Sequence, residues 1–156
     1  MGYSVVVYFY NPNIFPFEEY EKRLEAEKSL CSHFGCELII GKYEQDVYYD
    51  FVTGLENEPE KGKRCVKCFE LRLRKSAELA KSMRIKEFTT SMVISPHKNY
   101  ETLTAIGNSI AEEFGLIYNS TNFRKADGFL KTNNISKSLN LYRQNYCGCK
   151  FAMRNS

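Results

Sequence analysis

The chain of 156 residues has no tryptophan, only two histidines and no apolar run long enough to cross a membrane. The run from Tyr3 to Tyr10 is too short for a span, and it lacks the basic stretch and cleavage pattern of a signal peptide. We therefore expect a cytoplasmic protein with no membrane partner, in a reducing setting where structural disulfides are rare. His33 is expected on the solvent side of a helix and is not expected to bind a metal, whereas His97, which follows Pro96, is better placed for a site but is expected in an exposed loop.

Composition is that of an ordinary globular protein. Hydrophobic residues make up 43% and charged residues 26%, and no repeat, linker or low-complexity stretch stands out. The length predicts a single α/β domain over residues 1–156. A core of this size needs no disulfides, so the six cysteines are the feature to explain.

The net charge of +3 conceals an uneven distribution along the chain. Residues 1–60 carry a net charge of −8, residues 61–86 carry +8 and residues 87–156 carry +3. A basic block beside a pair of cysteines suits a polyanion such as nucleic acid, although a solvated basic helix face gives the same pattern.

Predicted strands and helices alternate along the chain. The strands are residues 3–10 (buried on both faces), 36–43, 88–94 and 116–118, and the helices are residues 17–34, 65–83, 99–114 and 136–145. The first helix is expected to place Phe17, Tyr20, Leu24, Cys31 and Phe34 on one apolar face. The connection 44–64 is long for a structureless loop, so it is either functional or contains a short helix, and 119–134 is a polar loop.

This order predicts an α/β fold with a mostly parallel sheet flanked by helices. In such sheets the site lies at the carboxyl ends of the strands. Residues 11–15, 91–98 and 119–125 follow strands and are therefore expected there.

The six cysteines differ in their setting. Cys31 and Cys36 fall on an apolar helix face and at the start of a strand, where a free cysteine behaves as a small hydrophobe. Cys65 and Cys68 form a C-x-x-C pair at a helix start, where both sulfurs can reach one metal or close a redox disulfide. Flanking cations at Lys63, Arg64 and Lys67 favour thiolate.

Cys147 and Cys149 are separated by a single glycine. A disulfide across one residue is a small strained ring, which suits a working redox pair, and both thiolates can alternatively bind a metal. Together with Cys65 and Cys68 they provide four thiols, enough for a tetrahedral zinc site or an iron–sulfur cluster. Spacing alone does not separate these two.

Seven strings in chain order resemble those of the QueH-type epoxyqueuosine reductases. They are residues 8–14 (YFYNPNI), 58–69 (EPEKGKRCVKCF), 72–73 (RL), 88–90 (FTT), 95–96 (SP), 123–125 (FRK) and 141–149 (LYRQNYCGC). The resemblance covers nearly the whole chain, and the strings around the two cysteine pairs are specific.

The resemblance implies a Rossmann-like fold of the adenine-nucleotide-hydrolase type. It implies reduction of the epoxide of epoxyqueuosine in tRNA to queuosine. It also implies a 4Fe-4S cluster, with an additional iron as a further option, and an electron donor of unknown identity. Cys65 and Cys68 would be cluster ligands, and Cys147 and Cys149 would be the catalytic redox pair or ligands of the further iron. Candidate residues for binding the modified tRNA are Asn11, Asn13, Arg64, Arg124, Lys125, Arg143, Gln144 and Tyr146.

The sequence departs from the family pattern in three places. It begins at what resembles the family's second strand, so the first β-α unit and its adjacent Cys-Cys ligands have no counterpart here, and a homodimer or partner chain would supply the missing strand. Phe15 stands where the family usually has His, and Asn122 where it usually has Asp. Each change removes a ligand or proton donor.

The chemistry of the cysteines leaves three hypotheses open. In the first, a cluster on Cys65 and Cys68 activates the epoxide or relays electrons while Cys147 and Cys149 cycle between dithiol and disulfide. In the second, a truncated or divergent family member without reductase activity keeps a zinc or iron site and binds RNA or protein. In the third, the chain is a metal-free thiol–disulfide oxidoreductase.

Overall fold

The computed structural model describes residues 2–155, with side chains described as far as residue 153. It divides into two compact units: the residues up to 49 together with those from 134 onward, and residues 50–133. Each unit is described by itself. The prediction of one domain stays a prediction.

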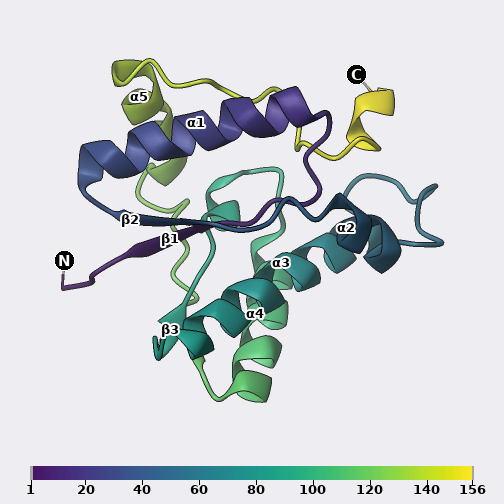
Figure 1. The fold of residues 1–156 in the computed structure, drawn as a ribbon, viewed down its shortest axis with the longest axis horizontal. Helices are drawn as coiled ribbons and strands as arrows, with labels where there is room; N and C mark the ends of the chain where they lie inside the picture. The colour runs from purple at the N-terminus through teal and green to yellow at the C-terminus, as the bar shows by residue number, and fades with distance from the viewer. Residues whose placement is uncertain (1, 156) are drawn as a thin grey trace. The chain divides into compact units, whose positions relative to one another are not determined.

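The first unit is built on two parallel strands and a long helix. Strand β1 (Val6–Phe9) pairs with β2 (Glu37–Ile40), with Val6 opposite Glu37 and Phe9 opposite Ile40. Helix α1 (Phe17–Phe34) joins them and runs alongside the pair in Figure 1. It ends as predicted at Gly35, whose φ of 68° is the left-handed conformation that closes helices.

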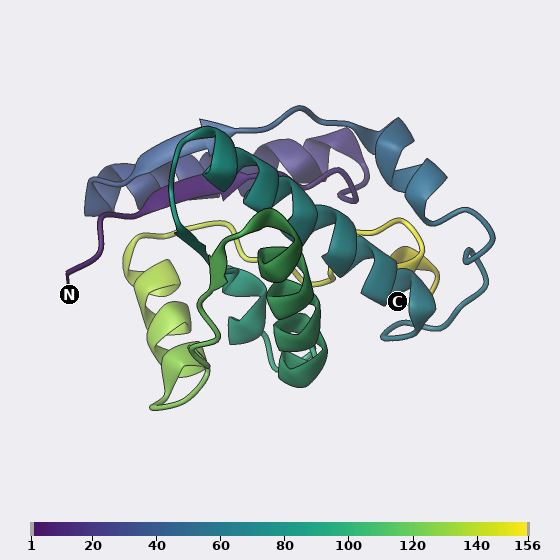
Figure 2. The ribbon, with the colours of Figure 1, turned by 90° about the horizontal axis from the view of Figure 1, so that it is seen from below.

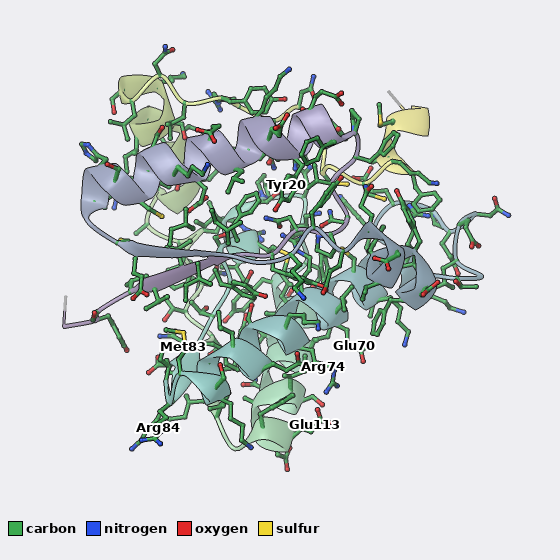
Figure 3. The ribbon with its side chains drawn as sticks, viewed as in Figure 1. Tyr20, Glu70, Arg74, Met83, Arg84 and Glu113 are labelled. Carbon is green, nitrogen blue, oxygen red and sulfur yellow. The ribbon has the colours of Figure 1, made fainter. Side chains whose placement is uncertain are left out.

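An aromatic core fills the space between α1 and the two strands. Tyr20 of α1, labelled in Figure 3, stacks on Tyr43, with the two ring centres 4.1 Å apart. Its ring also meets Phe9 edge to face at 5.4 Å. Ile14 joins this cluster at the end of the loop that follows β1. Because these rings fix the start of α1 against β1, they also fix the loop between them.

Two expectations about burial in this unit are wrong. The strand begins only at Val6, and Tyr3 and Val5 are 68% and 54% exposed, so the run is not buried on both faces. On α1, Tyr20 and Cys31 are buried, but Phe17 and Phe34 are 51% and 56% exposed. The two phenylalanines occupy the first and last turns of the helix.

The second unit packs two long helices on a very short sheet. Helix α3 (Lys63–Ser82) and α4 (Tyr100–Phe114) lie side by side in Figure 2, and β3 (Glu87–Phe88) pairs in parallel with β4 (Ile117–Tyr118). The predicted inward residues of α3 are buried: Phe69, Leu73, Ala77 and Ala80. They pack with Leu103 and Ile110 of α4 and with Phe88 and Tyr118 of the strands.

Helix α4 packs closely at Gly107 and also forms an ion pair with α3. A Cβ at Gly107 would lie 2.6 Å from the ring of Tyr118, so only glycine admits that ring. Figure 3 shows Arg74 of α3 beside Glu113 of α4, with Glu70 one turn earlier on α3. Arg74 is partly exposed and Glu113 is exposed, so this ion pair contributes little and the buried contacts hold the helices together.

The α/β class and the parallel pairing are confirmed, but the strands form two small sheets within the described residues and not one. The strand predicted over 88–94 is wrong beyond Phe88, because Ser91–Ile94 forms a 3-10 helix whose first turn is capped by the Thr90 side chain. Strand pairing stops where this local hydrogen bond competes with it.

The helix predicted over 136–145 is wrong in position. Helix α5 spans Gly128–Ser138 and begins inside the predicted loop 119–134. It ends early because Asn140 adopts a φ of 52° and Leu141 N–H closes back on the Ser136 carbonyl at 2.9 Å. The connection 44–64 does contain a short helix, α2 (Gln45–Phe51). None of the helices in residues 2–155 is both long and apolar enough to span a membrane.

Candidate functional site

The C-x-x-C pair lies in the first two turns of α3. Cys68 is buried and Cys65 is partly exposed. The N-cap residue, Gly62, has no side chain to bond the first backbone N–H groups, and the first turn holds no acidic residue. The positive end of a helix with free N–H groups suits negatively charged ligands, which is where a pair of metal-binding thiolates is stabilised.

A backbone N–H already points at one of these sulfurs. Lys61 N–H donates to Cys65 Sγ at 3.2 Å, from a tight turn in which Lys61 has a φ of 70°. Backbone N–H groups donated to sulfur are a feature of cysteines that bind iron–sulfur clusters, where they tune the potential.

Arg64, which directly precedes Cys65, is 3% exposed, and its side chain faces the loop before α3. Its guanidinium donates to the carbonyls of Leu55, Glu56 and Glu58 at 3.2, 3.3 and 2.6 Å. These bonds tie the loop to the first turn of α3. The structure thus gives Arg64 a structural task, and its predicted contact with tRNA stays a prediction.

The loops after β3 and β4 meet near the same end of α3. Arg124 donates from Nε to the Val93 carbonyl at 3.0 Å and from Nη2 to the Lys98 carbonyl at 2.8 Å. The Lys98 ammonium in turn lies 5.5 Å from the ring centre of Phe69, next to Cys68 in the sequence. Lys98, in the segment that follows β3, therefore lies beside Phe69, the residue next to the C-x-x-C pair.

Two more predicted positions belong to these loops. Lys125 is exposed. Asn122, which replaces the family's usual Asp, accepts the Arg124 N–H at 3.1 Å through its side-chain oxygen and so shapes its own turn.

The C-G-C pair lies in the other unit, against the loop that follows β1. Ile14 and Cys149 form an antiparallel bridge, and Phe15 N–H donates to the Gly148 carbonyl at 2.7 Å. The Tyr146 hydroxyl donates to the Phe15 carbonyl. Figure 1 shows the C-terminal segment, in yellow, beside the beginning of α1. Phe15, where the family usually has His, thus contributes backbone groups that hold the pair in place.

Cys149 is buried, and its sulfur has polar neighbours. The hydroxyl of Tyr48, itself 1% exposed, lies 3.1 Å from Cys149 Sγ, and Phe151 N–H donates to the same sulfur at 3.4 Å. Burial, and secondarily the nearby Cys149, raises the pKa of Tyr49, so this phenol stays neutral. Cys147 is partly exposed.

An arginine on α1 holds the backbone of the pair. Arg23 donates from Nη1 to the Cys147 carbonyl at 3.0 Å and from Nη2 to the Tyr146 carbonyl at 2.8 Å. Its Nε donates to Glu19 at 2.8 Å, and its guanidinium lies 5.2 Å from the centre of the Tyr146 ring. We name Glu19, Arg23 and Tyr142 the clasp.

Glu19 is the anionic centre of the clasp. Its carboxylate accepts the Tyr142 hydroxyl at 2.8 and 2.6 Å and the Arg23 guanidinium at 2.8 Å. Burial alone would raise the pKa of Glu19, but the hydrogen bonds from Tyr142 and Arg23, with the charge of Arg23, outweigh burial and lower that pKa. The hydrogen bond to Glu19 raises the pKa of Tyr142.

The remaining predicted binding residues have different settings. Asn13 is 3% exposed, and its Oδ1 has no hydrogen-bond partner among the described residues. Asn11 is partly exposed, and Arg143 and Gln144 are exposed. The last two are accessible to a large ligand.

A model of the family described as Epoxyqueuosine reductase QueH matches residues 1–155. The chain belongs to the QueH family. The QueH epoxyqueuosine reductase of Helicobacter pylori is 41% identical over 158 residues, covering 98% of this chain and 43% of the relative. That of Thermotoga maritima is 36% identical, covering 94% of this chain and 78% of the relative. That of Haemophilus influenzae is 37% identical, covering 99% of this chain and 64% of the relative.

The two cysteine pairs of this QueH-family chain have the chemistry of sulfur ligands, each with a backbone N–H donated to one of its sulfurs. A 4Fe-4S cluster takes four thiolates, and each unit contains one of the two pairs. Across residues 2–155, no three His, Cys, Asp or Glu side chains gather into a metal site. Each pair therefore fits part of a cluster's ligand set.

Sequence reasoning missed Arg23, Glu19 and Tyr48 as neighbours of the C-G-C pair. The spacing of Glu19 and Arg23, four apart on one helix, signals an ion pair but not its target. Arg23 and Cys147 are 124 positions apart, and Tyr48 and Cys149 are 101 apart. Single-sequence patterns contain no signal for such contacts.

Proposed function

We propose that this chain is an epoxyqueuosine reductase that converts epoxyqueuosine in tRNA to queuosine, on a Rossmann-like fold. The observation that supports it most is the family match over residues 1–155, which includes both cysteine pairs. The local structure agrees with it, because each pair has hydrogen-bond donors at sulfur.

The reaction turns an epoxide into an alkene and releases the oxygen as water, which takes two electrons and two protons. Oxidation of the Cys147 and Cys149 dithiol to a disulfide releases two electrons and two protons, so the two half-reactions balance. An external reductant of the dithiol or low-potential electron-carrier class then returns the disulfide to the dithiol. Tyr48 and Phe151 N–H hold the Cys149 sulfur in place while the pair is reduced.

Cys65 and Cys68 are the proposed ligands of the family's iron–sulfur cluster, with Cys147 and Cys149 as alternative ligands of a further iron. A bound cluster supplies one-electron transfer and a Lewis-acidic iron. The helix start around Cys65 favours the negative charge of such a site, and Arg64 keeps the preceding loop in place.

The tRNA is proposed to contact the exposed cations and aromatic rings of each unit. Lys125 is such a cation in one unit and Arg143 in the other, beside the exposed Tyr142. Cations that meet phosphates and rings that stack on an unpaired base are the usual means of binding a single-stranded RNA loop.

Iron binding and turnover in cysteine variants test this proposal. Cys65→Ser and Cys68→Ser are expected to lose iron and activity, and Cys147→Ser and Cys149→Ser to lose activity. Cys31→Ser and Cys36→Ser are the matched controls and are expected to keep both, because their sulfurs lie at the far end of α1 from the C-G-C pair. A Cys65→Ser protein with full iron and turnover would contradict the proposal.

The metal content of the purified protein distinguishes the reductase from the two alternative functions. A colourless, zinc-loaded protein without turnover would favour an RNA- or protein-binding module. Full turnover after chelation of all metal would favour a metal-free oxidoreductase.

A further inference from the structure

Through Arg23 of α1, the clasp reaches both carbonyls that precede the glycine of the C-G-C pair. Arg23 uses three of its N–H groups: one on the Glu19 carboxylate, one on the Tyr146 carbonyl and one on the Cys147 carbonyl. The Arg23 and Glu19 side chains are each only 9% exposed. A guanidinium that bonds a carboxylate on one side and two carbonyls on the other holds a backbone segment in one conformation better than a single flexible ammonium does.

Gly148 is the point where this segment comes closest to the clasp. Its φ of 107° is one that residues with a side chain rarely adopt. A Cβ at this position would lie 2.7 Å from Arg23 Nη1 and 3.0 Å from Ile14 Cγ1. The glycine therefore allows the turn to bend and lets the guanidinium lie against the backbone.

The shape that the clasp holds is that of the dithiol. No disulfide joins any of the six cysteines, all of which lie within the described residues. In that state Cys149 Sγ has the Tyr48 hydroxyl at 3.1 Å and the Phe151 N–H at 3.4 Å. Closing the eleven-membered disulfide ring between Cys147 and Cys149 moves the backbone between them. Two hydrogen bonds oppose this movement: the one from Arg23 to the Cys147 carbonyl and the one from Phe15 N–H to the Gly148 carbonyl.

We propose that Arg23, braced by Glu19, is a positioning residue that holds the Cys147-Gly148-Cys149 turn in its dithiol form and thereby makes the pair harder to oxidise. The inference rests on the proposed redox role of the pair. Stabilising the reduced form of a dithiol raises its reduction potential. The pair then resists adventitious oxidation by cellular disulfides and is ready, with two electrons and two protons, when the epoxide binds.

Equilibration with glutathione tests this without any tRNA. The purified 156-residue chain is incubated in buffers of reduced and oxidised glutathione, quenched with acid and alkylated, and the peptide containing Cys147 and Cys149 is quantified by mass. The dithiol gives up two electrons and two protons as its disulfide forms, and oxidised glutathione takes them to become two reduced molecules. Arg23→Met is expected to shift the equilibrium about tenfold toward the disulfide, which is about 30 mV for two electrons.

Two further variants make the result specific. Arg23→Lys keeps the charge but not the fork, so a smaller shift in the same direction is expected. Lys28→Met removes an exposed cation of α1 that pairs with Glu25, and no shift is expected. An Arg23→Met protein with the wild-type equilibrium, or one shifted toward the dithiol, would overturn the inference. If Arg23→Met does not fold, as judged by thermal melting, Arg23→Lys decides: equality with wild type overturns it.

The outcome is separable from that of the proposed function. A shifted glutathione equilibrium in a chain that leaves epoxyqueuosine untouched would refute the reductase proposal and keep the clasp. Reduction of epoxyqueuosine by the wild-type chain, together with an unshifted glutathione equilibrium in Arg23→Met, would refute the clasp inference and keep the reductase proposal.

Discussion

What surrounds each sulfur sets its chemistry in this protein. Cys31 lies on the buried side of α1, with its sulfur 3.7 Å from the Glu27 carboxylate. Burial first, and then the negative charge of Glu27, raises the pKa of Cys31 to about 11. Such a thiol stays protonated at neutral pH and is a poor nucleophile and a poor metal ligand. This agrees with the packing role predicted for it and separates it from the two cysteine pairs of the candidate site.

Pulse alkylation is expected to label Cys31 more slowly than Cys36 at pH 8. Alkylation needs the thiolate, and the raised pKa leaves Cys31 almost entirely as thiol until the pH approaches about 11. Peptide mass mapping after timed exposure to iodoacetamide measures both rates in one sample. Equal rates in the folded protein would show that Cys31 is neither buried nor protonated as described.

Glu19 is expected to make stability depend on acid pH. Its pKa is lowered in the folded state, so its stabilising contribution is present above its ordinary pKa and disappears as the pH falls through the lowered one. Thermal melts should show wild type more stable than Glu19→Gln at pH 7, with the difference shrinking as the pH falls below the ordinary pKa of a carboxyl group and through the lowered one. A difference that persists unchanged in acid would mean that the charge of Glu19 contributes nothing. Glu25→Gln, an exposed neighbour on α1, is the control.

At the scale of helices and strands, close packing is what the local sequence pattern does not reveal. Gly107 lies in the middle of α4, where an alanine would ordinarily favour the helix by about 1 kcal/mol. Here the ring of Tyr118, 6% exposed and packed in the core, occupies the space of the missing side chain.

Gly107→Ala is therefore expected to destabilise the protein by about 1–3 kcal/mol, because overpacking outweighs the gain in helix propensity. Asn108→Ala, one position along on the exposed side of α4, tests propensity alone and is expected to be neutral or slightly stabilising. Chemical denaturation of the two variants gives the comparison. Stabilisation by Gly107→Ala would show that the helix and β4 are not packed as described.

Helices could be predicted well wherever side-chain spacing and an end signal agree. Leu73 and Ala77 mark the buried face of α3, and Gly35 ends α1 with a left-handed turn. Strand and helix ends failed where a single local hydrogen bond decides them. Thr90 caps a 3-10 turn inside an otherwise strand-like run, and Asn140 closes α5 well before its predicted end.

The cysteines of the candidate site could be proposed from the sequence, but the residues that contact them could not. Cys65 and Cys147 could be identified because close spacing of cysteines has a chemical meaning that needs no structure. Arg23 and Tyr48 could not, because their contacts join segments more than a hundred positions apart. Asn13 is similar: its burial with an unpaired oxygen is visible only in the fold.

At the scale of the whole molecule, charge is divided along the chain. The acidic first part, net −8, is followed by the basic block of residues 61–86, net +8, which contains the C-x-x-C pair. Basic residues beside the proposed cluster ligands suit a nucleic-acid substrate whose phosphates must approach the site.

Binding of tRNA is expected to weaken about tenfold or more between 50 and 200 mM salt, since a few phosphate contacts suffice for that slope. Filter binding or fluorescence anisotropy over this range measures it. Lys125→Ala is expected to lower both the affinity and the slope, whereas the control Lys28→Ala is expected to change neither. An affinity that does not depend on salt would exclude a phosphate-binding surface.

The most direct measurement is the mass of the modified nucleoside after tRNA containing epoxyqueuosine has been incubated with the iron-loaded protein and a reductant. The account predicts that the nucleoside becomes lighter by one oxygen atom with the wild-type chain and with Cys36→Ser, and remains unchanged with Cys147→Ser. An unchanged nucleoside with the iron-loaded wild-type chain, or equal conversion by Cys147→Ser, would contradict it.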